Sequence, residues 1–489
     1  MMEEELYKSV IVTAKSVRSV LLEETSNVED CQKNLNALGQ IVSASSQSQE
    51  YRSQILANNG LPDVLVEILN RSFQDNVPTE ELKFTLYIRL MRGILLLARN
   101  LVITKQFVEF SSILSSLENF NQKVSHNNEF YSKTLVVYIQ FLANMSQITR
   151  EQNIVAEIVE TFFKNEDLMS LIANDDQMKM PFAAFLKNIL SNSDNLYDVL
   201  THDDTILRYT ISELDKADIH NEDLDQYSSL LILTFQNIIA HETYSKWLKR
   251  IDCESAEFSR IMKLNQVIVT SKEDWDNYQL TAMLAWIFDN FLVFSEISKS
   301  ILLSSIYDPL ELKRVHLNLI ILLDCLSDLG KFEATKQFLE HYNAIEELIS
   351  LLRVVHESVD RKTLKNKEKI EETVGKKEFP QVKSLIIEVI AFLVHGSFEI
   401  QEKMRELHGL ELVLSNCMID DNDPFIKERA IVCVKFLLAN NEKNQQFVAD
   451  LEAKQTVDDD ALKEVGYEVQ IEDGNVKLRK TENQKLQEI

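Results

Sequence analysis

Four asparagines recur at nearly equal intervals along the first half of the chain. Asn100, Asn144, Asn188 and Asn237 each occupy an apolar-x-Asn-apolar tetrapeptide, at intervals of 44, 44 and 49 residues. An amide offers both a donor and an acceptor, so such residues can bind the backbone of an extended peptide of any sequence. They can also satisfy carbonyl groups at the ends of their own helices. We regard the four as candidate protein-binding residues, although capping is favoured because no tryptophan stands four residues before any of them.

Acidic residues near position 420 suggest a cation site, but they fit a helix start better. Asp420, Asp421 and Asp423 precede Pro424 without the glycine and distal glutamate of an EF-hand loop, and the run 458–460 lacks them too. An aspartate before a proline is typical of a first helical turn, because its carboxylate accepts from free N–H groups and proline has none to satisfy. We predict that Asp423 and Pro424 form a structural cap.

The sequence motifs of common enzymes are missing. No Walker A, Gly-x-Ser-x-Gly or Gly-x-Gly-x-x-Gly sequence occurs, and after His241-Glu242 a serine, Ser245, stands where a zincin needs its second histidine. The five cysteines are widely spaced and form no Cys-x-x-Cys pair, which predicts buried thiols. We expect no catalytic residue, no metal site and no cofactor, and hence a protein that is not an enzyme.

Apolar residues recur at helical spacing along most of the chain, so helices must position the asparagines and aspartates described above. Only 9 glycines and 6 prolines occur among 489 residues, which disfavours turn-rich β architectures. The asparagine interval lies in or near the range of roughly 40 to 47 residues expected of HEAT and armadillo units. We therefore predict an all-α fold, an armadillo/HEAT-like right-handed α-solenoid. Alternating apolar residues on both sides of Asp473-Gly474 add a short C-terminal β-hairpin.

Charge patterning divides the chain into four segments. Between Glu357 and Glu378 lie seven Lys or Arg and six Asp or Glu with few apolar residues, which predicts a charged insertion or loop at 357–379. We assign armadillo-like helical repeats to 1–356, terminal repeats and a cap to 380–482, and a tail to 483–489.

Overall charge and hydropathy restrict the partners. The 77 acidic and 51 basic residues give a net charge of -26, which repels phosphate backbones and anionic membranes. We expect no nucleic-acid partner and no membrane span, since no apolar stretch approaches the roughly 18 residues that a span requires. The acidic N-terminus carries no export signal, which favours a cytoplasmic location. A basic peptide or basic protein face would be steered to the groove of such a solenoid.

The segment from Ser384 to Lys480 carries two distinctive stretches. In the first, Gln401, Arg405 and Gly409 succeed one another at intervals of four residues. The second runs from Cys417 to Glu428 and reads Cys-Met-Ile-Asp-Asp-Asn-Asp-Pro-Phe-Ile-Lys-Glu. In this order they resemble the C-terminal domain of the ataxin-10 family, and its fungal members most. The resemblance covers about 100 residues closely and the rest of the chain only as helical repeats.

This resemblance implies a function that the residue pattern alone does not. Asp423 stands where the family usually has asparagine, and Arg429 where it usually has an aromatic residue. Ataxin-10 proteins are armadillo-like cytoplasmic solenoids that act through protein contacts and are linked to cytokinesis and, in animals, to neuron survival. We accordingly expect a non-enzymatic scaffold or adaptor that binds a protein partner along its groove. The alternatives are a nuclear-transport-type adaptor for basic peptides, and an enzyme whose site cannot be read from one sequence.

Overall fold

The computed structural model separates the chain into two compact units, Met1–Ile238 and Ile239–Ile489. The sequence pattern did not predict this boundary. The residues that the structure describes are 2–22, 27–57, 60–74, 77–148, 152–217, 224–361, 374–450, 467–472 and 475–480.

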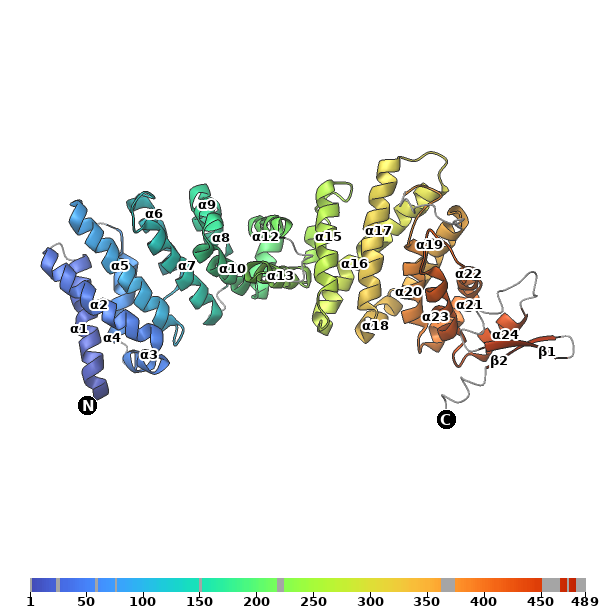
Figure 1. The fold of residues 1–489 in the computed structure, drawn as a ribbon, viewed down its shortest axis with the longest axis horizontal. Helices are drawn as coiled ribbons and strands as arrows, with labels where there is room; N and C mark the ends of the chain where they lie inside the picture. Colours follow the sequence, from blue (N-terminus) through green and yellow to red (C-terminus); the bar gives the residue numbers. More distant parts are fainter. Residues whose placement is uncertain are drawn as a thin grey trace. The chain divides into compact units, whose positions relative to one another are not determined.

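The first unit is built from helices in two rows (Figure 1). One row consists of long helices that pack on one another in sequence order, α2 (Val28–Gln47), α5 (Glu81–Val102), α7 (Tyr131–Ile148) and α10 (Asp176–Ile189), and is followed by α13 (Gln226–Ile239). We call these five the ladder helices. The other row begins with α1 (Met2–Leu22), α4 (Gly60–Arg71) and α6 (Phe110–Lys123). The remaining helices are α3 (Gln49–Leu56), α8 (Val155–Ile158), the π-helix η1 (Val159–Phe163), α9 (Glu166–Asn174), α11 (Ser193–Thr201) and α12 (Thr205–Lys216).

The second unit continues the same construction. Here α16 (Asn277–Leu303), α17 (Pro309–Leu329), α20 (Val382–Val394) and α23 (Ile426–Leu438) pack in series. They are accompanied by α14 (Tyr244–Leu248), α15 (Ala256–Thr270), α18 (Glu333–His341), α19 (Ala344–Ser358), α21 (Phe398–Glu406), α22 (Gly409–Ser415) and α24 (Glu442–Asp450). Each unit therefore buries the apolar stripe of one repeat against the next, and the predicted all-α solenoid is confirmed.

Local sequence explains where many of these helices begin. Asp308 accepts from the backbone N–H of Leu310, with Pro309 at the first helical position of α17, which is the arrangement typical of an aspartate before a proline. Asp276 and Gln279 form a reciprocal capping box at the start of α16. Within the units the largest buried side chains are aromatic, among them Trp286 and Tyr138.

The β-hairpin predicted at the C-terminal end is present. Strands β1 (Tyr467–Glu472) and β2 (Asn475–Lys480) pair antiparallel, with Glu472 opposite Asn475. The two turn residues, 473 and 474, lie outside the described residues.

The charged segment 357–379 is described only at its two ends. The backbone N–H of Asp360 donates to the carbonyl of Lys377 at 3.2 Å, which brings the ends together. Phe379 is buried beside His316, with ring centroids 4.8 Å apart. Residues 362–373, which hold most of the predicted insertion, lie outside the described part, as do 451–466 and the tail from 481.

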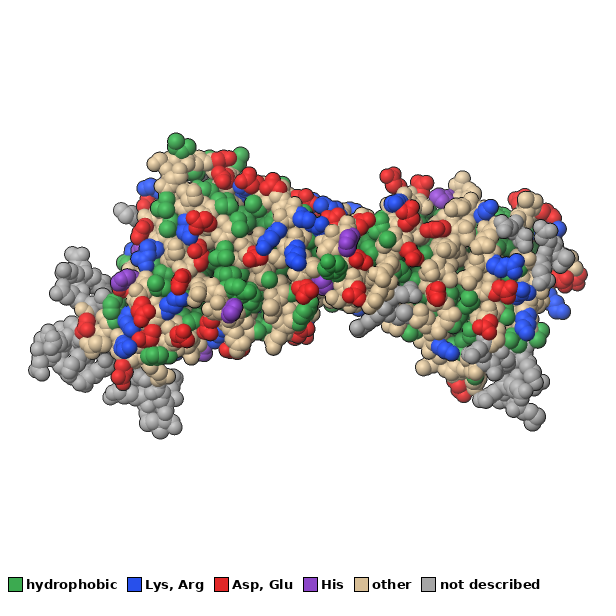
Figure 2. All heavy atoms as spheres, turned by 180° about the vertical axis from the view of Figure 1, so that it is seen from behind, with side chains coloured by type: hydrophobic (Ala, Val, Ile, Leu, Met, Phe, Trp, Pro, Cys, Tyr) green, Lys and Arg blue, Asp and Glu red, His purple; other side chains and the backbone are tan. Residues whose placement is uncertain are grey.

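Helix α16 is long and apolar enough to cross a membrane by length and composition. In the second unit, however, 61% of that apolar window is buried, as in the core helix of a soluble protein. The face shown in Figure 2 carries acidic and basic side chains interspersed with smaller apolar areas.

Candidate protein-binding surface

The exposed side of α5 is a stripe set by its helical period. Thr85, Arg89, Arg92, Leu96 and Arg99 are partly or fully exposed and follow i, i+4, i+7, i+11 and i+14. The opposite side of the helix is apolar and buried, so packing of the unit leaves this stripe outward. The stripe is therefore a direct consequence of the sequence pattern.

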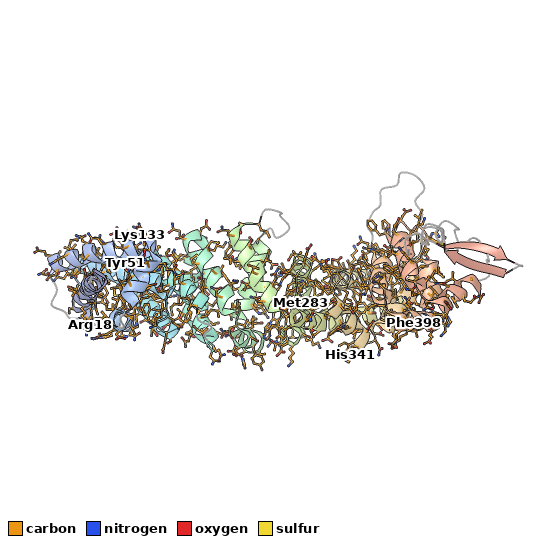
Figure 3. All side chains as sticks on the ribbon, turned by 90° about the horizontal axis from the view of Figure 1, so that it is seen from below. Arg18, Tyr51, Lys133, Met283, His341 and Phe398 are labelled. Carbon is orange, nitrogen blue, oxygen red and sulfur yellow. The ribbon has the colours of Figure 1, made fainter. Side chains whose placement is uncertain are left out.

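Helix α7 contributes a parallel stripe that meets the first through hydrogen bonds. Lys133, Gln140 and Asn144 lie on its exposed side. The guanidinium of Arg92 donates to the backbone carbonyl of Lys133 at 3.2 Å, and that of Arg99 donates to the Gln140 side chain. Lys133 and Arg18 lie on opposite sides of the first unit in Figure 3, so the stripe is remote from the ion pair that Arg18 forms with Glu67.

Asn100 joins this surface to the preceding repeat. Its amide nitrogen donates to the Ser45 hydroxyl at 2.9 Å and to the Val42 carbonyl at 3.3 Å, both on α2. Its oxygen accepts from two nitrogens of the Arg99 guanidinium, at 3.2 and 3.0 Å. With 5% exposure and both amide atoms occupied, Asn100 is a structural link between helices and has no atom left for a ligand.

The other three asparagines repeat this link with one difference. Asn144 donates to the backbone carbonyl of Arg99 at 3.1 Å. This carbonyl is one of the last four of α5 and has no partner within its own helix. Asn188 donates to the Ser146 hydroxyl at 3.0 Å, and Asn237 to the Ser191 hydroxyl at 3.5 Å. None of the three amide oxygens has a hydrogen bond among the described residues, so each can accept one from a ligand.

The four asparagines thus link neighbouring repeats, a contact that was not predicted from the sequence. Each amide reaches back to a residue of the preceding repeat and leaves its own helix end alone. Three of the acceptors are serines whose hydroxyls donate in turn to a nearby backbone carbonyl. Ser45 and Ser146 donate within their own helices, and Ser191 donates from the turn after α10 to Lys187. One amide side chain per repeat therefore supports the solenoid and, at Asn144, Asn188 and Asn237, also presents an acceptor at its surface.

The stripe is basic, a property that sequence reasoning missed. Arg89 and Lys133 are exposed and both flank the Phe130 ring, with the guanidinium carbon and the ammonium nitrogen 5.9 and 5.4 Å from its centroid. Burial lowers the pKa of Arg92 and of Arg99, and the charge of Arg92 lowers the pKa of Arg99 further. A signal was available, because α7 has no acidic residue and α5 has only Glu81, but the net charge of -26 concealed it.

The resemblance-bearing residues Gln401 and Arg405 hold the terminal repeats together. The Gln401 amide nitrogen donates to the carbonyls of Val394, Phe436 and Ala439, and so joins the ends of α20 and α23. Three further contacts tie α21 to the start of α24, namely Arg405 with Asn444, Lys443 with Glu402, and Asn441 with Gln401. An ion pair within α21 joins Arg405 to Glu402. These contacts assign a packing role to the motif.

Asp423 acts as a cap on a neighbouring helix. Its carboxylate accepts from the backbone N–H of Ser384 at 2.8 Å, in the first turn of α20, while Pro424 lies in a turn and α23 begins two residues later at Ile426. The second carboxylate oxygen is buried without a partner. Burial raises the pKa of Asp423, and the hydrogen bonds from Ser384 oppose this rise only in part.

A buried ion pair lies next to this cap. The ammonium of Lys383 is 2.6 Å from a carboxylate oxygen of Asp420, and both side chains are almost fully buried. They form part of the wall of a pocket of about 230 Å³, together with His356, Arg361 and Met418. A second, more open hollow of about 640 Å³ lies in the first unit between α6 and α9 and is mainly acidic, with Glu118, Glu160, Glu166 and Asp167 in its lining.

Catalytic or metal chemistry finds no support in the described residues. No group of three or more His, Cys, Asp or Glu that could hold a metal ion occurs among them. Burial raises the pKa of the Cys417 thiol to about 12 and raises those of Cys325 and Cys433 as well, so these thiols are poor nucleophiles. His241 is buried and interacts with Thr243 through its ring nitrogen at 2.7 Å.

Helices stacked in repeats with an open polar surface define an armadillo-like helical-repeat protein. The Spinocerebellar ataxia type 10 protein domain matches residues 382–479. The Ataxin-10 homolog of Candida albicans is 35% identical over 406 residues, which is 80% of this chain and 85% of the relative. That of Candida glabrata is 29% identical over 96% of this chain and 98% of the relative. The chain therefore belongs to the ataxin-10 family.

More distant similarities are shorter or weaker. Human Ataxin-10 is 34% identical over 99 residues, which is 20% of this chain and 21% of the relative. Among solved structures, a chain whose title describes a phosphorylation switch between cadherin and beta-catenin aligns with a TM-score of 0.38 and 12% identity, over 86% of this chain and 77% of its own length. That similarity is too weak to add to the fold described above.

Proposed function

We propose that this protein is a non-enzymatic cytoplasmic scaffold or adaptor that binds a protein partner along the stripe on α5 and α7. The observation that carries the proposal is the set of unpaired groups on one open surface. Arg89, Arg92, Arg99 and Lys133 have no carboxylate within ion-pair distance in the described part of the chain, and Asn144 has a free amide oxygen beside them. The guanidinium groups of Arg92 and Arg99 already donate hydrogen bonds within the protein. A partner can therefore add the charge pairing that all four cations lack.

Membership of the ataxin-10 family extends the proposal to a cellular role. The resemblance links the family to cytokinesis, and we extend that role to this chain together with the proposed cytoplasmic location. A yeast strain that lacks its own ataxin-10 homologue provides the test. We expect the wild-type chain to restore cell separation and an Arg92→Glu/Arg99→Glu variant of equal abundance to fail. Full rescue by the variant would show that the stripe is not needed for the proposed role in cytokinesis.

The binding surface itself can be mapped with the partner that co-purifies with the chain. Amine-reactive cross-linking followed by mass spectrometry should place the partner next to Lys83 and Lys133, near the stripe. Lys15 and Lys123 are exposed on α1 and α6, in the other row of helices, and serve as internal controls. Cross-links concentrated at Lys15 and Lys123 would place the interface on the other row.

A basic partner, which the net charge favours, would bind away from the stripe. The acidic hollow between α6 and α9 could receive a lysine or arginine side chain, and it contains the π-helix η1, an element often found at functional sites. A nuclear-transport-type adaptor would instead need acidic residues beside the asparagines. There the structure has Arg99 next to Asn100 and Asn144, which disfavours that alternative.

A further inference from the structure

Four of the five ladder helices, α5, α7, α10 and α13, reverse the charge balance of the protein. The chain has 77 acidic and 51 basic residues, yet on these four helices acidic residues occur only at Glu81 and Asp176, each in a first turn. Their basic residues are Lys83, Arg89, Arg92, Arg99, Lys133, Lys179 and Lys187. A basic surface on a protein of net charge -26 does not follow from composition, so its position indicates the charge of what binds there.

The arginines of this stripe are costly in the free protein. Arg92 and Arg99 are half-buried, and among the described residues neither has a carboxylate within ion-pair distance. Partial burial of an unpaired cation costs free energy, because the protein replaces only some of its hydration. An arriving anion recovers part of that cost through charge-assisted hydrogen bonds to the guanidinium. The free stripe is thus prepared for carboxylates.

The geometry points to an extended acidic segment of a partner protein, with carboxylates three residues apart, as the ligand of the stripe formed by Arg89, Arg92, Arg99 and Lys133. This inference rests on the proposed scaffold function and names the chemistry of the partner. Arg92 and Arg99 are seven residues apart on α5, which corresponds to about 10 Å along the helix. Residues three apart in a polyproline II segment are about 9 Å apart and point to the same side.

The groups around the two arginines fit the remainder of such a segment. Arg89 and Lys133, held beside the Phe130 ring, can receive a flanking carboxylate at one end of the stripe. The free amide oxygen of Asn144, whose nitrogen is bonded to the Arg99 carbonyl, can accept a backbone N–H of the peptide. An acidic peptide is favoured over nucleic acid, because carboxylates at every third residue give a lower charge density than a phosphate polymer, so the net charge of -26 repels the peptide less.

Fluorescence anisotropy with the full-length chain and labelled 12-residue peptides tests the inference. One peptide carries glutamates at every third position, and its partners replace them by glutamine or lysine. We expect the glutamate peptide to bind more tightly than the other two. Arg92→Glu/Arg99→Glu should weaken its binding by about tenfold or more, because two charge-assisted contacts become repulsive. A Lys15→Glu/Lys123→Glu variant changes net charge equally on the other row of helices and should change the affinity less than about twofold.

Two further variants keep the result interpretable if charge reversal disturbs folding. Arg92→Gln/Arg99→Gln removes the charges without repulsion and should also weaken binding, whereas Arg92→Lys/Arg99→Lys should retain most of it. Circular dichroism reports the helix content of each protein. Equal binding of all three peptides, or equal weakening by the control variant, would overturn the inference. Tighter binding of a single-stranded oligonucleotide, lost in the same arginine variants, would overturn it in favour of a phosphate ligand.

The cross-linking and peptide-binding experiments test the proposed function and the acidic ligand separately. If the co-purified partner cross-links near Lys133 but the glutamate peptide does not bind selectively, the scaffold function is supported and the acidic ligand is contradicted. Selective, arginine-dependent peptide binding supports the acidic ligand even in a cell assay that shows no cytokinesis defect.

Discussion

At the scale of single residues, the four asparagines perform one structural task at different depths. Asn100 is buried and saturates both amide atoms, whereas Asn237 makes one long, exposed contact of 3.5 Å. We expect Asn100→Ala to lower the free energy of unfolding by about 1 to 3 kcal/mol, because Ser45 and the Arg99 guanidinium lose a buried partner. Asn237→Ala should cost less than about 0.5 kcal/mol. Denaturant unfolding of both variants measures the difference, and equal losses would contradict the packing account.

Asp423 is a residue whose effect on stability changes with pH. Burial raises the pKa of Asp423 from its ordinary value, so ionisation costs folding free energy. That cost is fully present above the raised pKa and disappears as the pH falls below the unfolded-state value. We expect Asp423→Asn to be at least as stable as wild type at pH 7, with its relative advantage declining as the pH is lowered toward 3. Asp423→Ala should lose about 1 kcal/mol at pH 7. Thermal melts from pH 3 to 7 test both, and a constant difference for Asn would oppose the assignment.

At the scale of elements, the buried pair of Lys383 and Asp420 joins α20 to the loop before α23. Lys383→Met should lower the free energy of unfolding by about 3 to 5 kcal/mol, because the buried carboxylate of Asp420 loses the ammonium that neutralises its charge. The double variant Lys383→Met/Asp420→Leu should recover much of this loss. The coupling energy from a double-mutant cycle measures the interaction between the two side chains. Strictly additive losses would show that they do not interact.

The predictable parts of these elements are the local ones. Helical stripes and the C-terminal hairpin follow from spacings of a few residues, and the sequence predicted them. The cap at Asp308 depends on the same kind of short spacing. The partners of the asparagines could not be predicted, because Ser146 and Asn188 are 42 positions apart and meet only when two repeats stack. The cap of α20 by Asp423 likewise joins residues 39 positions apart. The basic stripe was visible in the sequence, but it has meaning only once α5 and α7 lie side by side.

At the scale of the whole molecule, the net charge of -26 and the basic stripe respond to salt in opposite ways. Raising the salt concentration shortens the Debye length from about 30 Å at 0.01 M to about 10 Å at 0.1 M, so self-repulsion within the acidic chain declines. We therefore expect the thermal midpoint to rise by several degrees between 0.01 and 0.3 M sodium chloride. The affinity for the glutamate peptide should fall over the same range, because the attraction at Arg92 and Arg99 is screened by the same ions. Differential scanning fluorimetry and anisotropy on one protein preparation measure both, with sucrose as the uncharged control. A midpoint that falls with salt would show that attractive ion pairs outweigh the net repulsion, and peptide affinity that is constant with salt would show that the stripe does not bind through charge.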